Sequence, residues 1–441
     1  MGINVSGLMF DAKKAIKNLK RIIIMVSRCL VLAFLGVLML SCKTRQVVSE
    51  PVKPKPKAEV KKVEPLTIDT VVQRTPISGT INFLLLLPAD LAEVFDVDTL
   101  SSDSGIVQRE YSKNLIEALN FYEGALLAVD SLRKAGYDVK LKVVDLPADE
   151  ERQTTKVWIQ KYENINLVFS MLRGKPLKTL SGILTTKKIP LISCAVNSCS
   201  VVEKNPMAIC VQPSSLTQCA MVGVYARDRF KGDNIIIITG TNEKEKERSD
   251  AFLSAFTDTL ARARMRKVNF SADGVAGLTK SLSLAYTNTL YVPSTDEDFV
   301  TALYSALETF DGKYRFRVIG LPVWQLFETI DPRMLEKYNT ILFASEYYSY
   351  DDDAVVQFRT DFRHQFGTEP GDEAYLAYDS FLQFGKLYIN RQLPIDVPET
   401  KFQGLRTQYL FHDNDSIAAE NQYIHIIKIE NFRYVKVNRE N

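Results

Sequence analysis

Residues 207–240, MAICVQPSSLTQCAMVGVYARDRFKGDNIIIITG, place a longer amphipathic segment between two short apolar runs. The flanking runs, MAICVQP and DNIIIITG, end in Pro213 and Gly240, which is typical of short buried strands followed by turns. Between them, Cys219, Val222 and Tyr225 fall at three-residue spacing within 214–230. This spacing predicts a helix with one apolar face. A helix that joins two apolar strands indicates a parallel sheet.

The same alternation continues in both directions along the chain. Strands are predicted at 80–88, 139–146, 166–172, 189–193, 265–270, 288–293 and 315–322, and helices at 115–132, 151–162, 176–186, 245–263, 274–286 and 296–309. The 362 residues after position 79 exceed what one hydrophobic core usually serves. The pattern therefore predicts an α/β protein of two doubly wound, Rossmann-like parallel-sheet lobes. A ligand of such a fold binds at the carboxyl ends of the strands, in the crevice between the lobes.

The N-terminal part carries a targeting signal. Residues 28–42, RCLVLAFLGVLMLSC, have an Arg before an apolar run that is too short for a membrane span but suits a signal peptide. Leu38 to Cys42 resembles the bacterial lipobox, which implies that Cys42 becomes a lipidated first residue. An uncleaved anchor helix is the alternative, and translation starting at Met25 would give a more compact signal.

Composition changes abruptly after Cys42. Within residues 43–79, Pro51, Pro54, Pro56 and Pro65 are set among lysines, and this composition favours an extended spacer, at roughly 3.1 Å per residue up to ~100 Å long. Residues 1–42 carry six Lys/Arg against one Asp, and residues 43–79 carry eight against four. Because the whole chain is +2, residues 80–441 carry about −7. A folded part this acidic is a poor partner for nucleic acid.

Six segments in order resemble the type I periplasmic binding proteins, the family of the leucine/isoleucine/valine-binding proteins. They are INFLLLLP, VVDLPADEE, KKIPLISCAVNS, VQPSSLTQCAMVGVYARDRF, AYLAYDSFLQFGKLY and the tail from FQGLRTQYLF to FRYVKV. The resemblance covers residues 80–432 and implies two hinged lobes, each made of discontinuous chain. It places the first lobe at 80–213 and 341–393, and the second at 214–340 and 394–441.

The resemblance also indicates where a ligand would bind, although the family's hydroxyl cluster is missing. The matching positions are Arg173 and Lys175 after one strand, Ser193, Cys194, Ala195 and Asn197 after the next, and Asn242 in the second lobe. Arginine and lysine in place of hydroxyls favour an anionic ligand, because they form charge-assisted hydrogen bonds to carboxylate or phosphate. The alternative is that both cations lie in solvent above a pocket that has lost its ligand.

Four cysteines lie close together between positions 194 and 219. Their spacing contains no Cys-x-x-Cys pair and the three histidines are remote, so we expect no metal site. Outside the cytosol thiols tend to oxidise, and among the three possible pairings the local sequence favours Cys199 with Cys210. Buried free thiols are the equal alternative. We expect Cys219 to be a core residue on the apolar face of its helix, and we expect Cys194 to line the pocket.

Catalysis is not supported by the residues available. No histidine lies near a Gly-x-Ser-x-Gly turn, and no glycine-rich phosphate loop occurs, so we expect neither an enzyme nor a cofactor. Two functions remain. One is a lipid-anchored, periplasm-facing solute-binding protein that binds a small polar ligand, amino-acid-like or anionic, between two lobes and serves an ABC-type transporter or a sensor. The other is an interaction module with a degenerate cleft, such as an activator of a cell-wall synthase. Lys43 after the lipidated Cys is compatible with sorting to the outer membrane.

Overall fold

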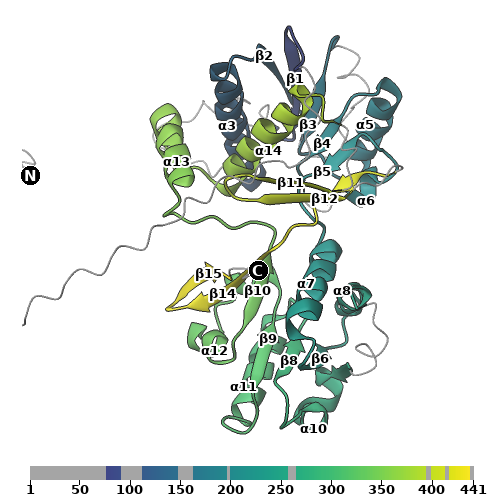
Figure 1. Ribbon diagram of the computed structural model, residues 1–441, viewed down its shortest axis with the longest axis vertical. Coiled ribbons are helices and arrows are strands. Elements are labelled where there is room, and N and C mark those ends of the chain that lie inside the picture. The colour runs from purple at the N-terminus through teal and green to yellow at the C-terminus, as the bar shows by residue number, and fades with distance from the viewer. Residues whose placement is uncertain are drawn as a thin grey trace, which may run out of the picture. The chain divides into compact units, whose positions relative to one another are not determined.

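The computed structural model describes residues 76–90, 112–147, 162–195, 199–256, 265–393, 399–412 and 417–437. Its strands form two mainly parallel sheets flanked by helices, together with a separate two-stranded hairpin (Figure 1). The predicted α/β class with two wound sheets is confirmed. The predicted helix at 151–162 lies outside the described residues, as does the leader with its tether.

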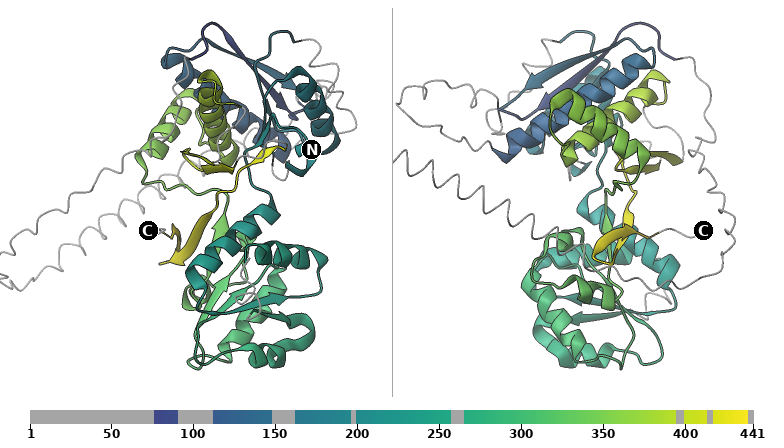
Figure 2. Two further views of the ribbon diagram at one scale, coloured as in Figure 1. Left: turned by 45° about the vertical axis from the view of Figure 1, so that its right-hand side comes forward. Right: turned by 90° about the vertical axis from the view of Figure 1, so that its left-hand side faces the viewer.

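The first sheet has six parallel strands in the order β13-β5-β4-β3-β1-β2. Its strands are β1 (Ile81–Leu87), β2 (Val139–Asp145), β3 (Leu167–Ser170), β4 (Leu191–Ser193), β5 (Ala208–Cys210) and β13 (Ala419–Glu420). Helices α3 (Lys113–Lys134) and α14 (Asp372–Ile389) cover one face and pack side by side (Figures 1 and 2). Helices α5 (Gly174–Lys187) and α6 (Cys199–Val202) cover the other face.

Close contact between α3 and α14 depends on one small residue. A Cβ atom at Gly124 of α3 would lie 2.1 Å from the carbonyl oxygen of Ala374 at the start of α14. No side chain fits at that distance, so the glycine lets the two backbones touch. Helix α13 (Asp353–Phe366) then joins the pair through Phe358 and Phe362.

The second sheet has seven strands in the order β15-β14-β10-β9-β8-β6-β7. Its strands are β6 (Asn234–Thr239), β7 (Arg266–Asn269), β8 (Asn288–Tyr291), β9 (Phe316–Ile319), β10 (Ile341–Ala344), β14 (His425–Glu430) and β15 (Arg433–Lys436). It is flanked by α7 (Ser215–Phe230), α8 (Glu243–Ser254), α10 (Phe270–Ser281), α11 (Glu297–Glu308) and α12 (Pro332–Lys337). Strands β14 and β15 run antiparallel to their neighbours.

Two of the expected lobe boundaries differ from the sheet membership. Strand β10 was assigned to the second part of the first lobe, but it pairs with β9 and β14 in the seven-stranded sheet. Residues 394–441 were assigned to the second lobe, but β13 pairs with β5 in the six-stranded sheet. The hairpin of β11 (Glu399–Gln403) and β12 (Gln408–His412) also belongs with the first sheet, because Phe384 of α14 packs against its Tyr409.

One helix ends earlier than its sequence pattern predicts. Helix α10 stops at Ser281, whereas the expected helix continued to 286. The buried side chain of Asn288 accepts from the backbone N–H of Ser283 at 2.8 Å and donates to its carbonyl at 2.9 Å. The hydroxyl of Ser283 accepts from the N–H of Tyr286. These bonds replace helical ones and hold residues 282–287 as a turn before β8.

Candidate functional site

Two neighbouring strands of the six-stranded sheet end in serine. Ser170 of β3 and Ser193 of β4 are paired in register, and both are fully buried. The hydroxyl of Ser170 accepts from the N–H of Leu172 at 3.1 Å. The hydroxyl of Ser193 has no hydrogen-bond partner within the described part of the chain. A buried hydroxyl without a hydrogen-bond partner lowers the free energy of unfolding, and the hydroxyl of Ser193 lies at the carboxyl edge of the sheet.

Two cations follow directly after β3. Arg173 is the N-cap of α5 without a side-chain cap bond, and Lys175 lies in the first turn, which contains no acidic residue. Both side chains are exposed. Between them Gly174 adopts a φ of 53°, a backbone conformation that glycine takes at little cost. The free N–H groups of a helix start and two cations together favour an anion at this edge.

The second predicted cluster is buried rather than open. Cys194 and Ala195 are 0% and 1% exposed. The N–H of Cys194 donates to the carbonyl of Ser170 at 2.9 Å, and its own carbonyl accepts from the side chain of Gln212 at 2.8 Å. Burial raises the pKa of the Cys194 thiol to about 12, so it stays protonated at neutral pH. Asn197 lies outside the described residues.

In the second sheet, Asn242 has a structural role. It is the exposed N-cap of α8, and its side chain accepts from the N–H of Lys244 at 3.0 Å. Three residues later, Glu245 is 3% exposed and accepts from the N–H of Gly240 at 2.6 Å. Sequence reasoning missed Glu245, although an Asn followed three residues later by Glu matches the capping-box pattern. The turn after β6 is therefore fixed by its own side chains.

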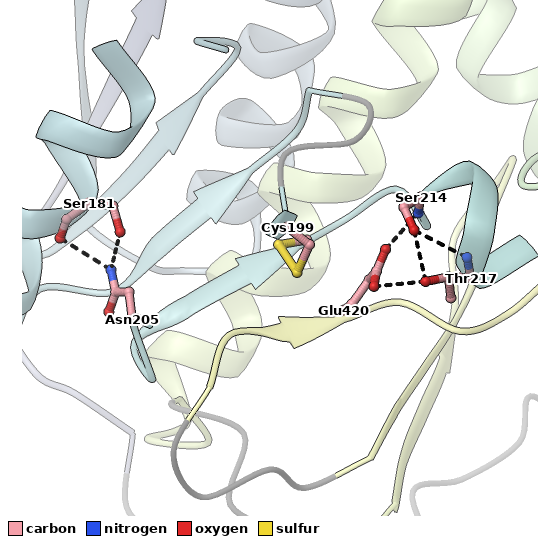
Figure 3. Close-up of a disulfide and its surroundings, with 7 residues drawn as sticks. Ser181, Cys199, Asn205, Ser214, Thr217 and Glu420 are labelled. Carbon is pink, nitrogen blue, oxygen red and sulfur yellow. Dashed lines mark hydrogen bonds between the residues drawn. A yellow bond between two sulfur atoms is a disulfide. The ribbon is translucent and has the colours of Figure 1, made fainter. Parts of the chain in front are cut away.

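The cysteines divide into one bonded pair and two free thiols. Cys199 and Cys210 form a disulfide with a Cα–Cα distance of 5.5 Å (Figure 3), and this is the pair that the sequence favours. Cys219 is free and lies in the core of the seven-stranded sheet, as its position on the helix predicts. Burial raises its pKa to about 11. Neither free thiol is positioned as a reactive group.

The aromatic and acidic run at 346–353 contributes to a core and a helix cap. Tyr348 stacks on Tyr375 of α14 with ring centroids 4.6 Å apart. Tyr350 lies beneath the guanidinium of Arg359 at 4.5 Å. Asp352 is the N-cap of α13 and accepts from the N–H of Ala354 at 2.9 Å. This run therefore contributes to packing and to a helix cap.

Within the described ranges, no group of three or more His, Cys, Asp or Glu side chains is arranged to hold a metal ion. Across these same residues, no helix combines the length and apolar character needed to cross a membrane.

Comparison with solved structures places this fold among periplasmic binding proteins. A putative branched-chain amino acid ABC transporter from Rhodospirillum rubrum matches with a TM-score of 0.55 and 12% identity, covering 82% of this chain and 100% of that one. An ABC transporter substrate-binding protein from Desulfitobacterium hafniense matches at 0.51 and 14%, covering 81% and 100%. The C-domain of LpoA from Haemophilus influenzae, a regulator of PBP1A, matches at 0.52 and 13%, also covering 81% and 100%.

No protein-family model matches the sequence, and no curated protein matches it. Identities of 12–14% show the fold alone. The described chain therefore has the type I periplasmic binding protein fold, on which both ABC transporter binding proteins and a regulator of PBP1A are built.

Proposed function

We propose that the protein is a lipid-anchored, periplasm-facing solute-binding protein that takes a small anionic ligand between its two lobes and presents it to an ABC-type transporter or a sensor. The similarity of the fold to substrate-binding proteins supports the general class. The local chemistry at the carboxyl edge of the six-stranded sheet supports the charge of the ligand.

The observation that carries this proposal is the pair of exposed cations at the start of α5. Arg173 and Lys175 stand at the N-terminus of the helix, with no acid in the first turn to neutralise them. The described residues provide no ion-pair partner for either side chain. A carboxylate or phosphate bound there would receive charge-assisted hydrogen bonds from side chains and backbone together. Asn242 is a helix cap and is not part of this proposed subsite.

Thermal unfolding of the full chain with a panel of ligands tests the proposal. The panel contains amino acids, dicarboxylates, inorganic phosphate and sulfate. A ligand at one hundred times its dissociation constant stabilises the folded state by about 2.7 kcal/mol, which raises Tm by several degrees. We expect Arg173→Ala and Lys175→Ala each to weaken binding of the active ligand at least tenfold, because each loses a charged contact.

Lys178 provides the matched control for these variants. It lies one turn further along α5, is exposed and has no ion pair among the described residues. Lys178→Ala changes the net charge by the same amount and should leave the dissociation constant within about twofold. Equal loss of affinity in all three variants would indicate general electrostatic attraction, and would contradict a subsite at the start of the helix.

The second candidate is an interaction module without a small ligand. The burial of Ser193, Cys194 and Ala195 favours it, because these side chains occupy the positions where the family contacts its ligand. The LpoA C-domain has the same fold and regulates PBP1A. If the whole panel leaves Tm unchanged and the purified protein binds a cell-wall synthase of the PBP1A type, this second function replaces the first.

A further inference from the structure

Three segments of backbone connect the two sheets, and each is linked to one hairpin, two of them by direct bonds and the first through the side chain of Asn421. Residues 211–214 lead from β5 to α7, residues 345–352 lead from β10 to α13, and residues 421–424 lead from β13 to β14. We call these segments the crossings. The hairpin of β11 and β12 lies beside all of them, and two buried polar side chains, Asn421 and Arg406, make most of the bonds.

Asn421 ties two crossings to the hairpin. The residue is fully buried, and its side-chain NH₂ donates to the carbonyl of Val211 at 3.1 Å and to that of Gln408 at 3.2 Å. Its side-chain oxygen accepts from the N–H groups of Leu410 and Tyr423, both at 3.0 Å. The first crossing, the third crossing and β12 therefore share one amide group whose hydrogen-bonding capacity is fully used.

Arg406 ties the remaining crossing to the same hairpin. It lies in the turn between β11 and β12, and its side chain is 6% exposed. It forms an ion pair with Glu346, and its carbonyl accepts from the N–H of Tyr347 at 2.9 Å. Burial lowers the pKa of Arg406, but the carboxylates of Glu346 and Asp372 more than offset this and hold it above its usual value. The guanidinium is thus a fixed positive charge against the crossing.

The hairpin is in turn anchored to α14. Asp379 of α14 is 1% exposed and accepts from the N–H of Leu405 at 2.6 Å and from that of Arg406 at 3.0 Å. A Cβ atom at Gly404 would lie 2.4 Å from the carboxyl carbon of Asp379, so the turn needs glycine for this approach. The turn is closed by a bond from the N–H of Gly404 to the carbonyl of Thr407 at 2.8 Å.

We propose that the β11–β12 hairpin is a clamp that holds all three crossings to the six-stranded sheet, with Arg406 and Asn421 as its positioning residues. Bending between the sheets is then restricted to the parts of the crossings that the clamp does not hold. In the second crossing this part is Ser345, which precedes the ion-paired Glu346. At the first crossing, Glu420 adds a tie at the start of α7.

Glu420 makes this tie from the last strand of the first sheet. Its carboxylate accepts from the N–H of Ser214 at 2.6 Å and from the hydroxyl of Thr217 at 2.8 Å (Figure 3). The hydroxyl of Ser214 caps α7 by accepting from the N–H of Thr217 at 3.1 Å. A carboxylate at a helix start is also favoured by the helix dipole. Helix α7 therefore begins at a fixed point on the first sheet, and this inference holds whether or not a ligand binds.

Hydrogen–deuterium exchange of the full chain, read by mass spectrometry under native conditions, tests the clamp. We expect Asn421→Leu to accelerate exchange about tenfold at 408–412 and 421–424, where its own bonds are lost. The clamp further predicts acceleration at 345–350, which Asn421 does not touch. Arg406→Met should accelerate exchange at 345–350 and also at 421–424. Peptides of β6 and β8 should be unchanged, because local opening leaves the second sheet folded.

Asn205→Leu is the matched control. Asn205 is another buried asparagine of the six-stranded-sheet part, and its side chain donates to the two oxygens of Ser181 (Figure 3). Its side-chain oxygen accepts from the N–H of Met207. It should accelerate exchange near its own contacts and not in the crossings. Glu346→Gln is a milder variant that weakens the Arg406 ion pair without removing a buried group, and it should show the same pattern to a smaller extent. Acceleration confined to each residue's own contacts would overturn the clamp.

Discussion

Asp379 shows how one buried carboxyl group links the hairpin turn to the pH response of the fold. Burial raises its pKa to about 6, although the N–H bonds from Arg406 and Leu405 act in the opposite direction. Its unfolded value is 3.8. Because the folded state binds the proton more tightly, Asp379 contributes most stability when protonated. This contribution is lost as pH rises from about 4 through about 6.

The pH dependence of stability in an Asp379→Asn variant tests this sign. The free energy of unfolding of the native chain, minus that of the variant, should fall by on the order of 3 kcal/mol between pH 4 and pH 7. Denaturant unfolding at one-unit pH intervals measures the difference. Taking this difference cancels the contribution of surface carboxylates, because they titrate alike in both proteins. A difference that rises with pH would mean that the hydrogen bonds outweigh burial.

At the scale of single residues, the sequence predicted where a residue lies along a helix or strand better than it predicted whether its side chain is buried. Arg173 and Lys175 were expected at the start of a helix after a strand, and they are found there. Ser193 and Cys194 follow a strand as expected, but their burial was not foreseen, because it depends on what packs over the strand end. The bond from Asn421 to Val211 spans 210 positions of sequence, and no local pattern predicts it.

The α6–β5 unit is held by a covalent link as well as by packing. The disulfide closes a loop of sequence separation 11, and Asn205 in that loop donates to the carbonyl and hydroxyl oxygens of Ser181 in α5. A loop of this size contributes about 3 kcal/mol in the chain-entropy description of disulfides.

We therefore expect reduction to lower the stability of the native chain. Dithiothreitol should reduce Tm by several degrees, whereas a Cys199→Ala, Cys210→Ala double variant should have the same Tm with and without it. Non-reducing peptide mapping should recover the two cysteines in one linked peptide. Alkylation of all four cysteines 194, 199, 210 and 219 in the unfolded, unreduced chain would show instead that the bridge does not form.

Elements with strong periodicity were the ones that sequence reasoning placed well. Helix α3 and the strand β6 follow their apolar patterns closely. Helix α10 was extended too far, because the polar contacts of Asn288 that end it come from the next strand. Strand β10 was assigned to the wrong sheet, since its four apolar residues fit a buried strand in either sheet.

At the scale of the whole molecule, the lipid anchor is a prediction from the N-terminal sequence. Metabolic labelling with palmitate in a bacterial host should mark the native chain, and the label should be absent from Cys42→Ser, because the lipidated thiol is gone. The folded part should have the same far-UV circular dichroism in both proteins. A labelled Cys42→Ser variant would place the lipid elsewhere, and an unlabelled native chain would leave a signal peptide or anchor helix as the alternative.

The path of the chain through the two sheets has a consequence for biosynthesis. Strand β14 lies between β10 and β15 in the second sheet, while β13, just before it, completes the edge of the first. Both sheets are therefore incomplete until residues 419–430 have been synthesised. Neither half can complete its sheet before these residues have left the ribosome, and until then the nascent chain presents unpaired strand edges. A contiguous fragment such as residues 80–213 would lack helix α14 and the edge strand β13, so its sheet would stay incomplete.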